Sequence, residues 1–306
     1  MKLGVTPWDF GRRTAQALTE QAQAAEALGY DSFWLPENHF NPGALPDPLM
    51  LLAGVAAGTR RLKLATTSYL LPLRHPLQAA EQVAVLDQLS DGRVILGIGR
   101  GYAPSMLQAF NVVPSEKRRV FEASLETMRR AWRGDPVVLE DGVTSVVLDP
   151  LPLQQPHPPL WVAAFGPKAL AQAGRLGLPY LASPMETLEK LQLNYQHHDA
   201  AASDSGIEPA RTRPIMRTVF VSDNRREVRE LQERMVLQAA KLGRLAADTP
   251  AEQWAIMGDA VQVRDQIAEY RERLEIDYLV VTRLRVDGVP KAAVHASMAA
   301  VAEIAG

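Results

Sequence analysis

The chain has 306 residues, of which 47% are hydrophobic and 22% are charged, a composition typical of a folded globular protein with a sizeable core. Its formal net charge of -2 argues against a nucleic-acid partner, because no broad cationic surface is available to neutralise a phosphate backbone. The absence of cysteine excludes disulfides, a thiolate nucleophile and a Cys-ligated metal, so any redox chemistry must come from a bound cofactor.

From the N-terminus onward, residues 1–10 lack the continuous apolar segment of a signal peptide. No apolar stretch approaches the roughly 20 residues that cross a bilayer. No run of Lys and Arg is long enough to bind an anionic membrane surface. We therefore expect a cytoplasmic protein with no membrane partner.

Short β-branched or apolar runs alternate along the chain with segments whose apolar residues recur at three- and four-residue spacing. The runs predict eight strands, at Lys2–Val5, Ser32–Leu35, Leu62–Ser68, Val94–Ile98, Leu160–Ala164, Tyr180–Ala182, Ile215–Val221 and Tyr278–Thr282. The spaced segments predict helices at Thr14–Leu28, Pro48–Thr59, Pro76–Leu89, Glu116–Trp132, Pro167–Leu176, Thr187–Ala202, Arg225–Leu245, Val261–Leu274 and Val289–Ile304.

The predicted strands are too apolar to have a solvated face, so they favour an all-parallel sheet. Closure at eight strands gives an α/β fold of the (β/α)₈ TIM-barrel type, with residues 1–306 as one domain. An open doubly wound sheet is the alternative.

Two segments interrupt the alternation, after strands 4 and 7. Asp135–Pro159 is rich in proline, and its Glu140–Gly142 turn between valine-rich runs predicts a hairpin followed by an extended loop. Arg225–Met257 is predicted to be one long helical tract. We interpret both as insertions into the barrel, and long βα insertions commonly act as lids.

Catalytic chemistry in such a barrel lies where the strands end, at the C-terminal face. Directly after strand 2 come Glu37, Asn38, His39 and Phe40, the most concentrated set of reactive side chains in the chain. His39 could transfer a proton near neutral pH, and Glu37 could orient it or a cofactor. Alternatively, Glu37 and His39 only satisfy backbone groups of the loop. No second histidine-rich segment offers a partner for a metal, so no metal site is expected.

The next strand ends offer candidates for binding a planar, phosphate-bearing ligand. After strand 3, Thr66–Ser68 would let a ligand approach the backbone, while Arg74 and His75 could cap the loop or pair with an acid. The glycine-rich turn Gly97–Tyr102 after strand 4 does not fit a dinucleotide fingerprint, because Tyr102 stands where that motif has glycine or alanine. These glycines could equally serve barrel packing.

Two features of these turns point to a phosphate. Arg100 offers a guanidinium suited to bidentate phosphate binding. After strand 5, Ala164, Phe165 and Gly166 precede Pro167 at the start of a helix, whose free N–H groups could bind the same anion. Every βα junction has such a helix N-terminus, so this second feature is weak without Arg100.

Several motifs together resemble the bacterial luciferase-like, flavin-dependent monooxygenase family. The similar pieces span nearly the whole chain and are Glu37–Phe40, Leu70–Pro76, Glu81–Arg93, Gly97–Tyr102, Pro156–Ala163 and Gly258–Asp259. The resemblance implies a flavin across the C-terminal mouth of the barrel, with a non-prolyl cis peptide after strand 3. It implies cofactor binding by Ser68, Tyr69, Arg100, Ala164, Phe165 and Gly166, with Arg100 and the backbone of Phe165 and Gly166 on the phosphate.

The resemblance further implies a two-component monooxygenase. Reduced flavin mononucleotide (FMN) from a separate flavin reductase would react with oxygen, and a flavin hydroperoxide would oxygenate a small organic substrate, with His39, Asn38 and Glu37 as catalytic residues. The family also implies a homodimer. The family turn commonly reads Glu-His-His-Phe, and Asn38 replaces the first histidine here, which argues against aldehyde-oxidising luminescence because an amide cannot exchange a proton near pH 7.

Two alternatives share the barrel. One is a deazaflavin-dependent dehydrogenase or reductase that moves a hydride, although that branch usually has a glycine-richer turn after strand 5 than Ala164–Pro167. The other is a flavin-binding protein without turnover. Retention of His39 and Arg100 argues against this second alternative.

Overall fold

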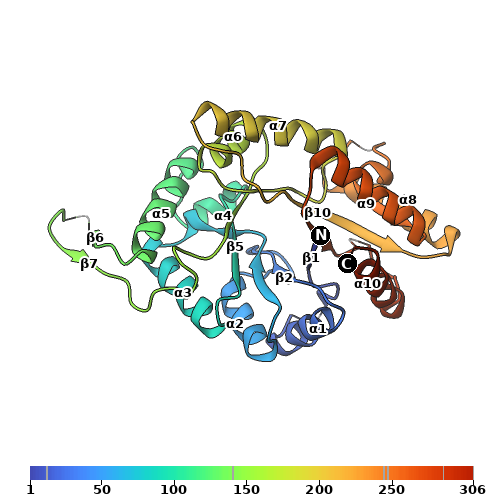
Figure 1. Ribbon diagram of the computed structural model, residues 1–306, viewed down its shortest axis with the longest axis horizontal. Helices are drawn as coiled ribbons and strands as arrows, with labels where there is room; N and C mark the ends of the chain where they lie inside the picture. The colour runs from blue at the N-terminus through green and yellow to red at the C-terminus, as the bar shows by residue number, and fades with distance from the viewer. Residues whose placement is uncertain (12, 140, 244, 247, 285, 306) are drawn as a thin grey trace. The chain divides into compact units, whose positions relative to one another are not determined.

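The computed structural model describes residues 1–305 except 12, 140, 244, 247 and 285, and shows strands and helices in alternation along the chain (Figure 1). The chain divides into two compact units. Unit 1 comprises Met1–Phe10, Ala24–Phe33 and Ala164–Gly306, and unit 2 comprises Gly11–Gln23 and Trp34–Ala163. Helix α1 (Ala15–Ala27) and strand β2 (Ser32–Leu35) each contribute residues to both units.

Unit 2 is built on the parallel strands β3, β5 and β8. Strand β5 lies between β3 and β8, and the short β4 also pairs with β5 in parallel. All six residues of β5 are buried, as expected for a strand covered on both faces. The elements are α2 (Pro48–Gly58), β3 (Lys63–Thr66), β4 (Tyr69–Leu70), a 3₁₀ helix (Leu71–Leu73), α3 (Pro76–Leu89), β5 (Val94–Gly99), α4 (Pro104–Ala109), α5 (Lys117–Trp132), β6 (Val137–Val138), β7 (Ser145–Val146) and β8 (Leu160–Ala163).

Helix α2 is fixed at both ends by polar groups. Asp47 accepts a hydrogen bond from the Met50 amide, and Pro48 occupies the first turn, where its missing N–H costs nothing. At the other end, the buried Arg93 guanidinium donates to the carbonyls of Ala56 and Thr59. An arginine at this end also complements the negative pole of the helix dipole.

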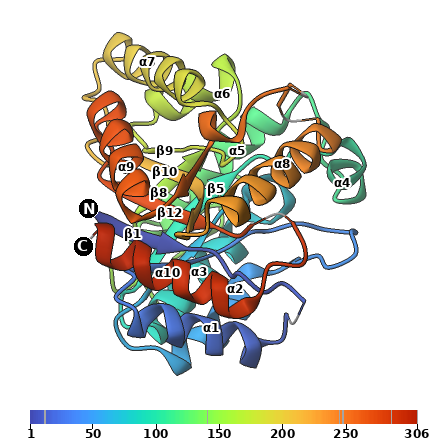
Figure 2. The ribbon, with the colours of Figure 1, turned by 90° about the vertical axis from the view of Figure 1, so that its right-hand side faces the viewer.

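Unit 1 contains a second parallel sheet segment in the order β11, β10, β12, β1, followed by the first residues of β2. Helices α6 and α7 lie side by side (Figure 1), and α9 and α10 pack against β10 (Figure 2). The elements are β1 (Lys2–Val5), α6 (Pro167–Arg175), β9 (Tyr180–Leu181), α7 (Leu188–Asp204), β10 (Pro214–Val221), α8 (Arg225–Lys241), a 3₁₀ helix (Ala251–Gln253), β11 (Ala255–Gly258), α9 (Ala260–Leu274), β12 (Tyr278–Thr282) and α10 (Lys291–Ala305).

The Gly258–Asp259 motif serves to start a helix. The Asp259 side chain accepts from the amides of Val261 and Gln262, and the Gln262 side chain accepts from the Asp259 amide. This reciprocal capping box satisfies the N–H groups that the first turn of α9 leaves without helical partners.

The expected alternation of strands and helices is confirmed, and one predicted element is wrong. All eight predicted strands exist within two residues of their predicted ends, but Arg225–Met257 is not one helical tract. Helix α8 ends at Lys241, and Ala255–Gly258 forms β11, which pairs in parallel with β10. A four-residue apolar run has too few residues for its periodicity to distinguish strand from helix.

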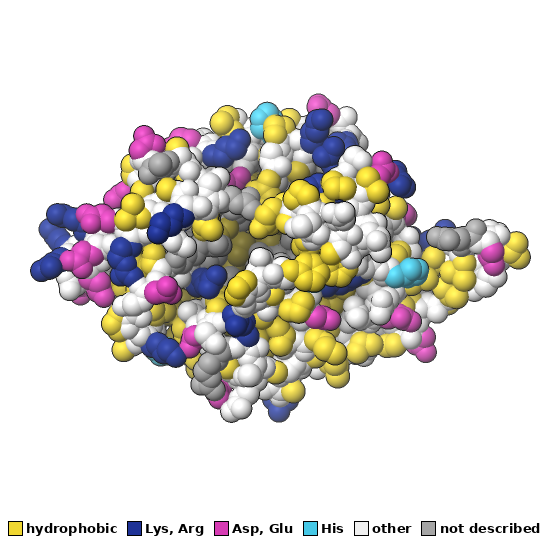
Figure 3. Space-filling view, turned by 180° about the vertical axis from the view of Figure 1, so that it is seen from behind, with side chains coloured by type: hydrophobic (Ala, Val, Ile, Leu, Met, Phe, Trp, Pro, Cys, Tyr) yellow, Lys and Arg dark blue, Asp and Glu magenta, His cyan; other side chains and the backbone are white. Residues whose placement is uncertain are grey.

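The hairpin predicted between α5 and β8 is present. Strands β6 and β7 pair antiparallel and project from the α5 end of unit 2 (Figure 1). Glu140, in the predicted turn, lies outside the described residues. Seen from behind, the hairpin presents hydrophobic side chains to solvent (Figure 3), and Val143 at its tip is 87% exposed.

Among the residues that the structure describes, no helix combines the length and the apolar character needed to cross a membrane.

Candidate active site

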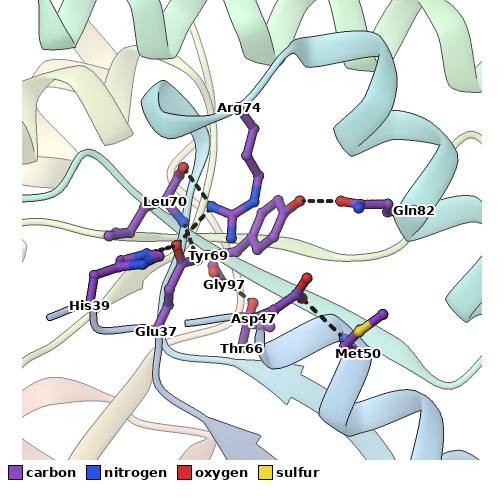
Figure 4. Close-up of polar contacts among 10 residues, drawn as sticks. All are labelled: Glu37, His39, Asp47, Met50, Thr66, Tyr69, Leu70, Arg74, Gln82 and Gly97. Atoms are coloured by element: carbon purple, nitrogen blue, oxygen red, sulfur yellow. Dashed lines mark hydrogen bonds and ion pairs between the residues drawn. The ribbon is translucent and has the colours of Figure 1, made fainter. Parts of the chain in front are cut away.

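The candidate site lies in unit 2, where β2, β3 and β5 reach their carboxyl ends. The amide of Thr67, just after β3, donates to the carbonyl of Leu35, the last residue of β2, at 2.8 Å. The Thr66 hydroxyl donates to the carbonyl of Gly97 in β5, also at 2.8 Å. These two bonds hold the three strand ends together and bring the loops that follow them to one place (Figure 4).

The Glu37 carboxylate is the centre of this site. Its Oε1 accepts from His39 Nε2 at 2.7 Å and from Arg74 NH1 at 2.8 Å, and its Oε2 accepts from the Leu70 amide at 3.0 Å (Figure 4). The carboxylate side chain is 0% exposed. Its contacts therefore fit the orienting role foreseen for Glu37 and leave it no access to a ligand.

The position of the Glu37 carboxylate determines which nitrogen of His39 carries the proton. A carboxylate only accepts hydrogen bonds, so the facing nitrogen, Nε2, must be the protonated one. The neutral ring then has its lone pair on Nδ1, and no hydrogen bond from the described part of the chain occupies that lone pair. The His39 side chain is 7% exposed, and its ring meets Phe110 edge-on at 4.9 Å. The His39 imidazole is thus fixed in orientation and largely shielded from water.

Asn38 closes the loop that carries these residues. Its side-chain Oδ1 accepts from the backbone amide of Leu45 at 3.0 Å, and its backbone amide donates to the Leu45 carbonyl at 3.1 Å. The oxygen of the side chain is thereby committed to the loop. The side-chain NH₂ group is left to donate a hydrogen bond toward a ligand, and the role of Asn38 in catalysis stays a prediction.

The loop after β3 contains the predicted non-prolyl cis peptide, which joins Thr67 and Ser68. Ser68 lies against Gly99, and a Cβ on Gly99 would collide with the Ser68 hydroxyl, so this position requires glycine. The Tyr69 side chain is fully buried and donates to Gln82 Oε1 of α3 at 3.0 Å. Any contact of Tyr69 with a flavin would therefore involve its main chain.

Arg100 is held at the end of β5. Its NH2 donates to the Ala163 carbonyl at 2.6 Å, its guanidinium lies 5.3 Å from the centre of the Phe121 ring, and the residue is 7% exposed. Burial, together with the nearby charge of Arg118, lowers the pKa of Arg100 to about 10, whereas Glu122 acts in the opposite direction. The residue stays positively charged at neutral pH.

A lysine that the sequence motifs did not single out lies next to Arg100. Lys117 Nζ donates to the Gly101 carbonyl at 3.1 Å. Burial lowers the pKa of Lys117, and the charges of Arg100 and Arg118 lower it further. Cations that repel one another in this way fit a dianionic ligand such as a phosphate monoester.

The remaining predicted cofactor residues belong to unit 1. Ala164 is buried, Phe165 is half exposed, and Gly166, with a φ of 78°, directly precedes Pro167 and α6. This backbone conformation favours glycine, and the first turn of α6 presents N–H groups without helical partners. The assignment of these residues to a flavin phosphate stays a prediction.

Comparison with protein families identifies relatives over most of the chain. The family model described as luciferase-like monooxygenase matches residues 4–275. The uncharacterized protein y4wF of Sinorhizobium fredii (strain NBRC 101917 / NGR234) is 37% identical over 205 residues, 64% of this chain and 58% of that protein. The oxygenase component of the flavin-dependent trigonelline monooxygenase of Acinetobacter baylyi is 29% identical over 224 residues, 68% of this chain and 59% of the relative. The chain thus spans about three fifths of these curated relatives.

Solved structures resemble the chain over almost its full length. Monooxygenase RslO1 from Streptomyces bottropensis matches with a TM-score of 0.83 at 26% identity, covering 99% of this chain and 98% of that one. The oxygenating constituent of 3,6-diketocamphane monooxygenase of Pseudomonas putida, in complex with FMN, matches at 0.84 and 20% identity, covering 99% and 97%. An F420-dependent secondary alcohol dehydrogenase in complex with an F420-acetone adduct matches at 0.78 and 20%, covering 99% and 98%. The last two likenesses concern the fold alone.

Proposed function

The chain belongs to the luciferase-like monooxygenase family, and on that premise we propose that it is the oxygenase of a two-component system. It would use reduced FMN from a separate reductase, together with oxygen, to oxygenate a small organic substrate. Support comes from the curated relative named as the oxygenase component of a flavin-dependent monooxygenase.

The observation that carries this proposal is the pair formed by His39 and Glu37. A fully buried carboxylate fixes the proton of His39 on Nε2, so that Nδ1 can accept a proton from a reacting group. Bound reduced flavin supplies the electrons for oxygen activation, with one oxygen atom entering the substrate and the other leaving as water. His39 moves the proton, the Asn38 amide donates a hydrogen bond, and Phe110 keeps water from the imidazole.

The residues present fit the proposed cofactor. A phosphate monoester needs cations and oriented N–H donors, and Arg100 and Lys117 supply the cations in unit 2. The backbone of Phe165 and Gly166, before α6, supplies donors in unit 1. Ser68 and Tyr69 would meet the flavin ring, with Tyr69 acting through its main chain.

We further propose that the two units form a single (β/α)₈ TIM-barrel domain, which is supported by the match to RslO1 over 99% of the chain. A homodimer and a cytoplasmic location stay predictions.

The alternative is a deazaflavin-dependent dehydrogenase or reductase, since an F420-dependent alcohol dehydrogenase has the same fold. In that case His39 would exchange a proton with a substrate oxygen while the cofactor carries the hydride. A carrier that binds flavin without turnover is a weaker alternative, because a carrier has no use for an imidazole held by a buried carboxylate.

Anaerobic titration separates these proposals. The protein is titrated with reduced FMN and, in parallel, with reduced deazaflavin, and is then mixed rapidly with oxygen while spectra are recorded. We expect tighter binding of reduced FMN and a transient absorbance before the oxidised flavin spectrum appears. Preference for the deazaflavin, without a reaction with oxygen, would move the protein to the hydride-transfer class. Tight binding of oxidised flavin with no turnover would indicate the carrier.

A further inference from the structure

We propose that Arg74 is a positioning residue that acts on His39 through Glu37, keeping the imidazole free to accept a proton at Nδ1. The role in turnover rests on the proposed function, whereas the effect on the ring belongs to the protein without cofactor. Arg74 directly follows the 3₁₀ helix after β4 and has no role in the proposed function.

Arg74 is held by three groups that fix its direction. Its NH1 donates to Glu37 Oε1 at 2.8 Å and to the Leu70 carbonyl at 3.1 Å. Its guanidinium lies 4.0 Å from the centre of the Tyr69 ring, within the range of a cation–π contact. The Tyr69 hydroxyl is in turn anchored on Gln82 of α3 (Figure 4). The arginine side chain is only 15% exposed, so this arrangement is an interior one.

The contact matters because Arg74 and His39 share one oxygen atom. Both donate to Glu37 Oε1, while Oε2 is occupied by the Leu70 amide. A buried carboxylate needs a neighbouring positive charge, and Arg74 supplies a permanent one. Without Arg74, the Glu37 carboxylate would favour the positively charged, imidazolium form of His39. A ring protonated on both nitrogens cannot accept a proton at Nδ1.

Asp47, a second carboxylate near this cluster, does not replace Arg74. Burial of the hydroxyl is the main cause that raises the pKa of Tyr69, Arg74 lowers it, and Glu37 and Asp47 raise it further. Asp47 is itself committed to the amide of Met50 at the start of α2. As a second negative charge, Asp47 would favour protonation of a nearby group and could not neutralise Glu37.

The simpler explanation is that Arg74 only stabilises its own turn, where its amide donates to the Leu71 carbonyl. This role depends on the backbone and would survive most side-chain changes. The two explanations therefore differ in what happens to the His39 ring when only the side chain is altered.

The test is nuclear magnetic resonance of ¹⁵N-histidine-labelled protein without flavin, at pH 7.5. Of the six histidines, His39 is assigned by the loss of its signals in His39→Gln. We expect the wild-type ring to carry its proton on Nε2. In Arg74→Met, the fraction of His39 rings protonated on both nitrogens should increase at least about threefold, since loss of a neighbouring opposite charge favours protonation. In Arg74→Lys, the fraction of His39 rings protonated on both nitrogens should lie between those of wild type and Arg74→Met, because lysine supplies charge without the planar contact on Tyr69.

A double variant makes the test independent of folding losses. Removing the anion together with its cation, in Arg74→Met/Glu37→Gln, should bring the doubly protonated fraction back toward the wild-type level. An unchanged His39 ring in Arg74→Met, or a double variant no different from Arg74→Met, would overturn the proposal. If Arg74→Met does not fold, the comparison of Arg74→Lys with wild type decides: an identical ring overturns it.

Turnover provides a second readout that is kept separate. In the oxygenase reaction, the low-pH limb of kcat should move upward by on the order of 1 pH unit in Arg74→Met, while the Kd for reduced FMN stays within about threefold. If His39 protonation changes in Arg74→Met but the wild type has no oxygenase activity, only the proposed function is contradicted. If the wild type is an active oxygenase but His39 protonation is unchanged in Arg74→Met, only the role of Arg74 is contradicted.

Discussion

Among single residues, we expect truncation of His39 to have the largest effect on the reaction of bound reduced flavin with oxygen. In His39→Ala, the group that accepts a proton at Nδ1 disappears, while the flavin phosphate site is untouched. After rapid mixing with oxygen, bound reduced FMN should therefore reach the oxidised spectrum at least about tenfold more slowly than in wild type, because the proton-transfer step loses its general acid–base group. The Kd for reduced FMN should stay within about threefold. Identical kinetics in this variant would return His39 to a structural role.

We expect Arg100 to contribute to binding of the flavin phosphate and not of the flavin ring. Arg100→Ala should weaken FMN binding by on the order of 2–3 kcal/mol, because it removes a charge-assisted hydrogen-bond donor. Riboflavin, which lacks the phosphate, should bind nearly as in wild type. Parallel titrations with both flavins check this, and Arg100→Lys serves as the control for a retained charge. Equal losses for both ligands would take Arg100 out of the phosphate site.

The sequence was most informative where neighbours in the chain become neighbours in the fold. Glu37 and His39 are two residues apart, and their pairing was one of the predicted options. For Arg74, pairing with an acid was one of two predicted options, but the sequence could not say that the acid would be Glu37, 37 positions away. Lys117 went unnoticed because it opens an ordinary charged helix and only the turn at Gly101 brings it to Arg100.

Between elements, the buried Arg93 links α2, the residue before β3 and the turn before β5 in unit 2. Its guanidinium donates to five acceptors: the carbonyls of Ala56, Thr59, Leu62 and Ser90 and the hydroxyl of Thr59. Arg93→Met should lower the free energy of unfolding by about 3 kcal/mol, since buried acceptors would lose their donor. Urea denaturation measures the loss. The exposed Arg264→Met is the matched control, with an expected change below about 0.5 kcal/mol. A similar small change in both variants would contradict this account.

The limits of sequence reasoning at this scale are visible in β11. Long amphipathic segments such as α3 and α9 were predicted within one residue of their ends. The predicted helical tract Arg225–Met257 runs into β11 because a run this short satisfies either period, and the partner strand β10 lies more than thirty residues earlier in the chain. Pairing with a distant strand is a tertiary effect that local pattern does not contain.

For the whole molecule, the buried tyrosines predict sensitivity to alkali. Burial raises the pKa of five of the seven tyrosines: Tyr30, Tyr69, Tyr180, Tyr195 and Tyr278. Below about pH 10 these groups are protonated in both folded and unfolded chains and leave stability unchanged. Above it, the unfolded chain releases protons that the folded chain retains, so stability falls by about 1.4 kcal/mol per pH unit for each group.

Absorbance at 295 nm and circular dichroism follow this transition together. We expect tyrosinate from the five buried residues to appear in one cooperative step with the loss of secondary structure above pH 10. Gradual ionisation of all seven tyrosines while the circular dichroism stays native would show that these rings are open to solvent.

The tip of the β6–β7 hairpin offers a chemical handle. Because the chain has no cysteine, a single thiol introduced there would be unique in the protein. Val143 is 87% exposed, so Val143→Cys would present that thiol to reagents without disturbing a core contact. A fluorophore or spin label attached at this one position could then report reductase docking or oligomer formation in solution, with no background from native thiols.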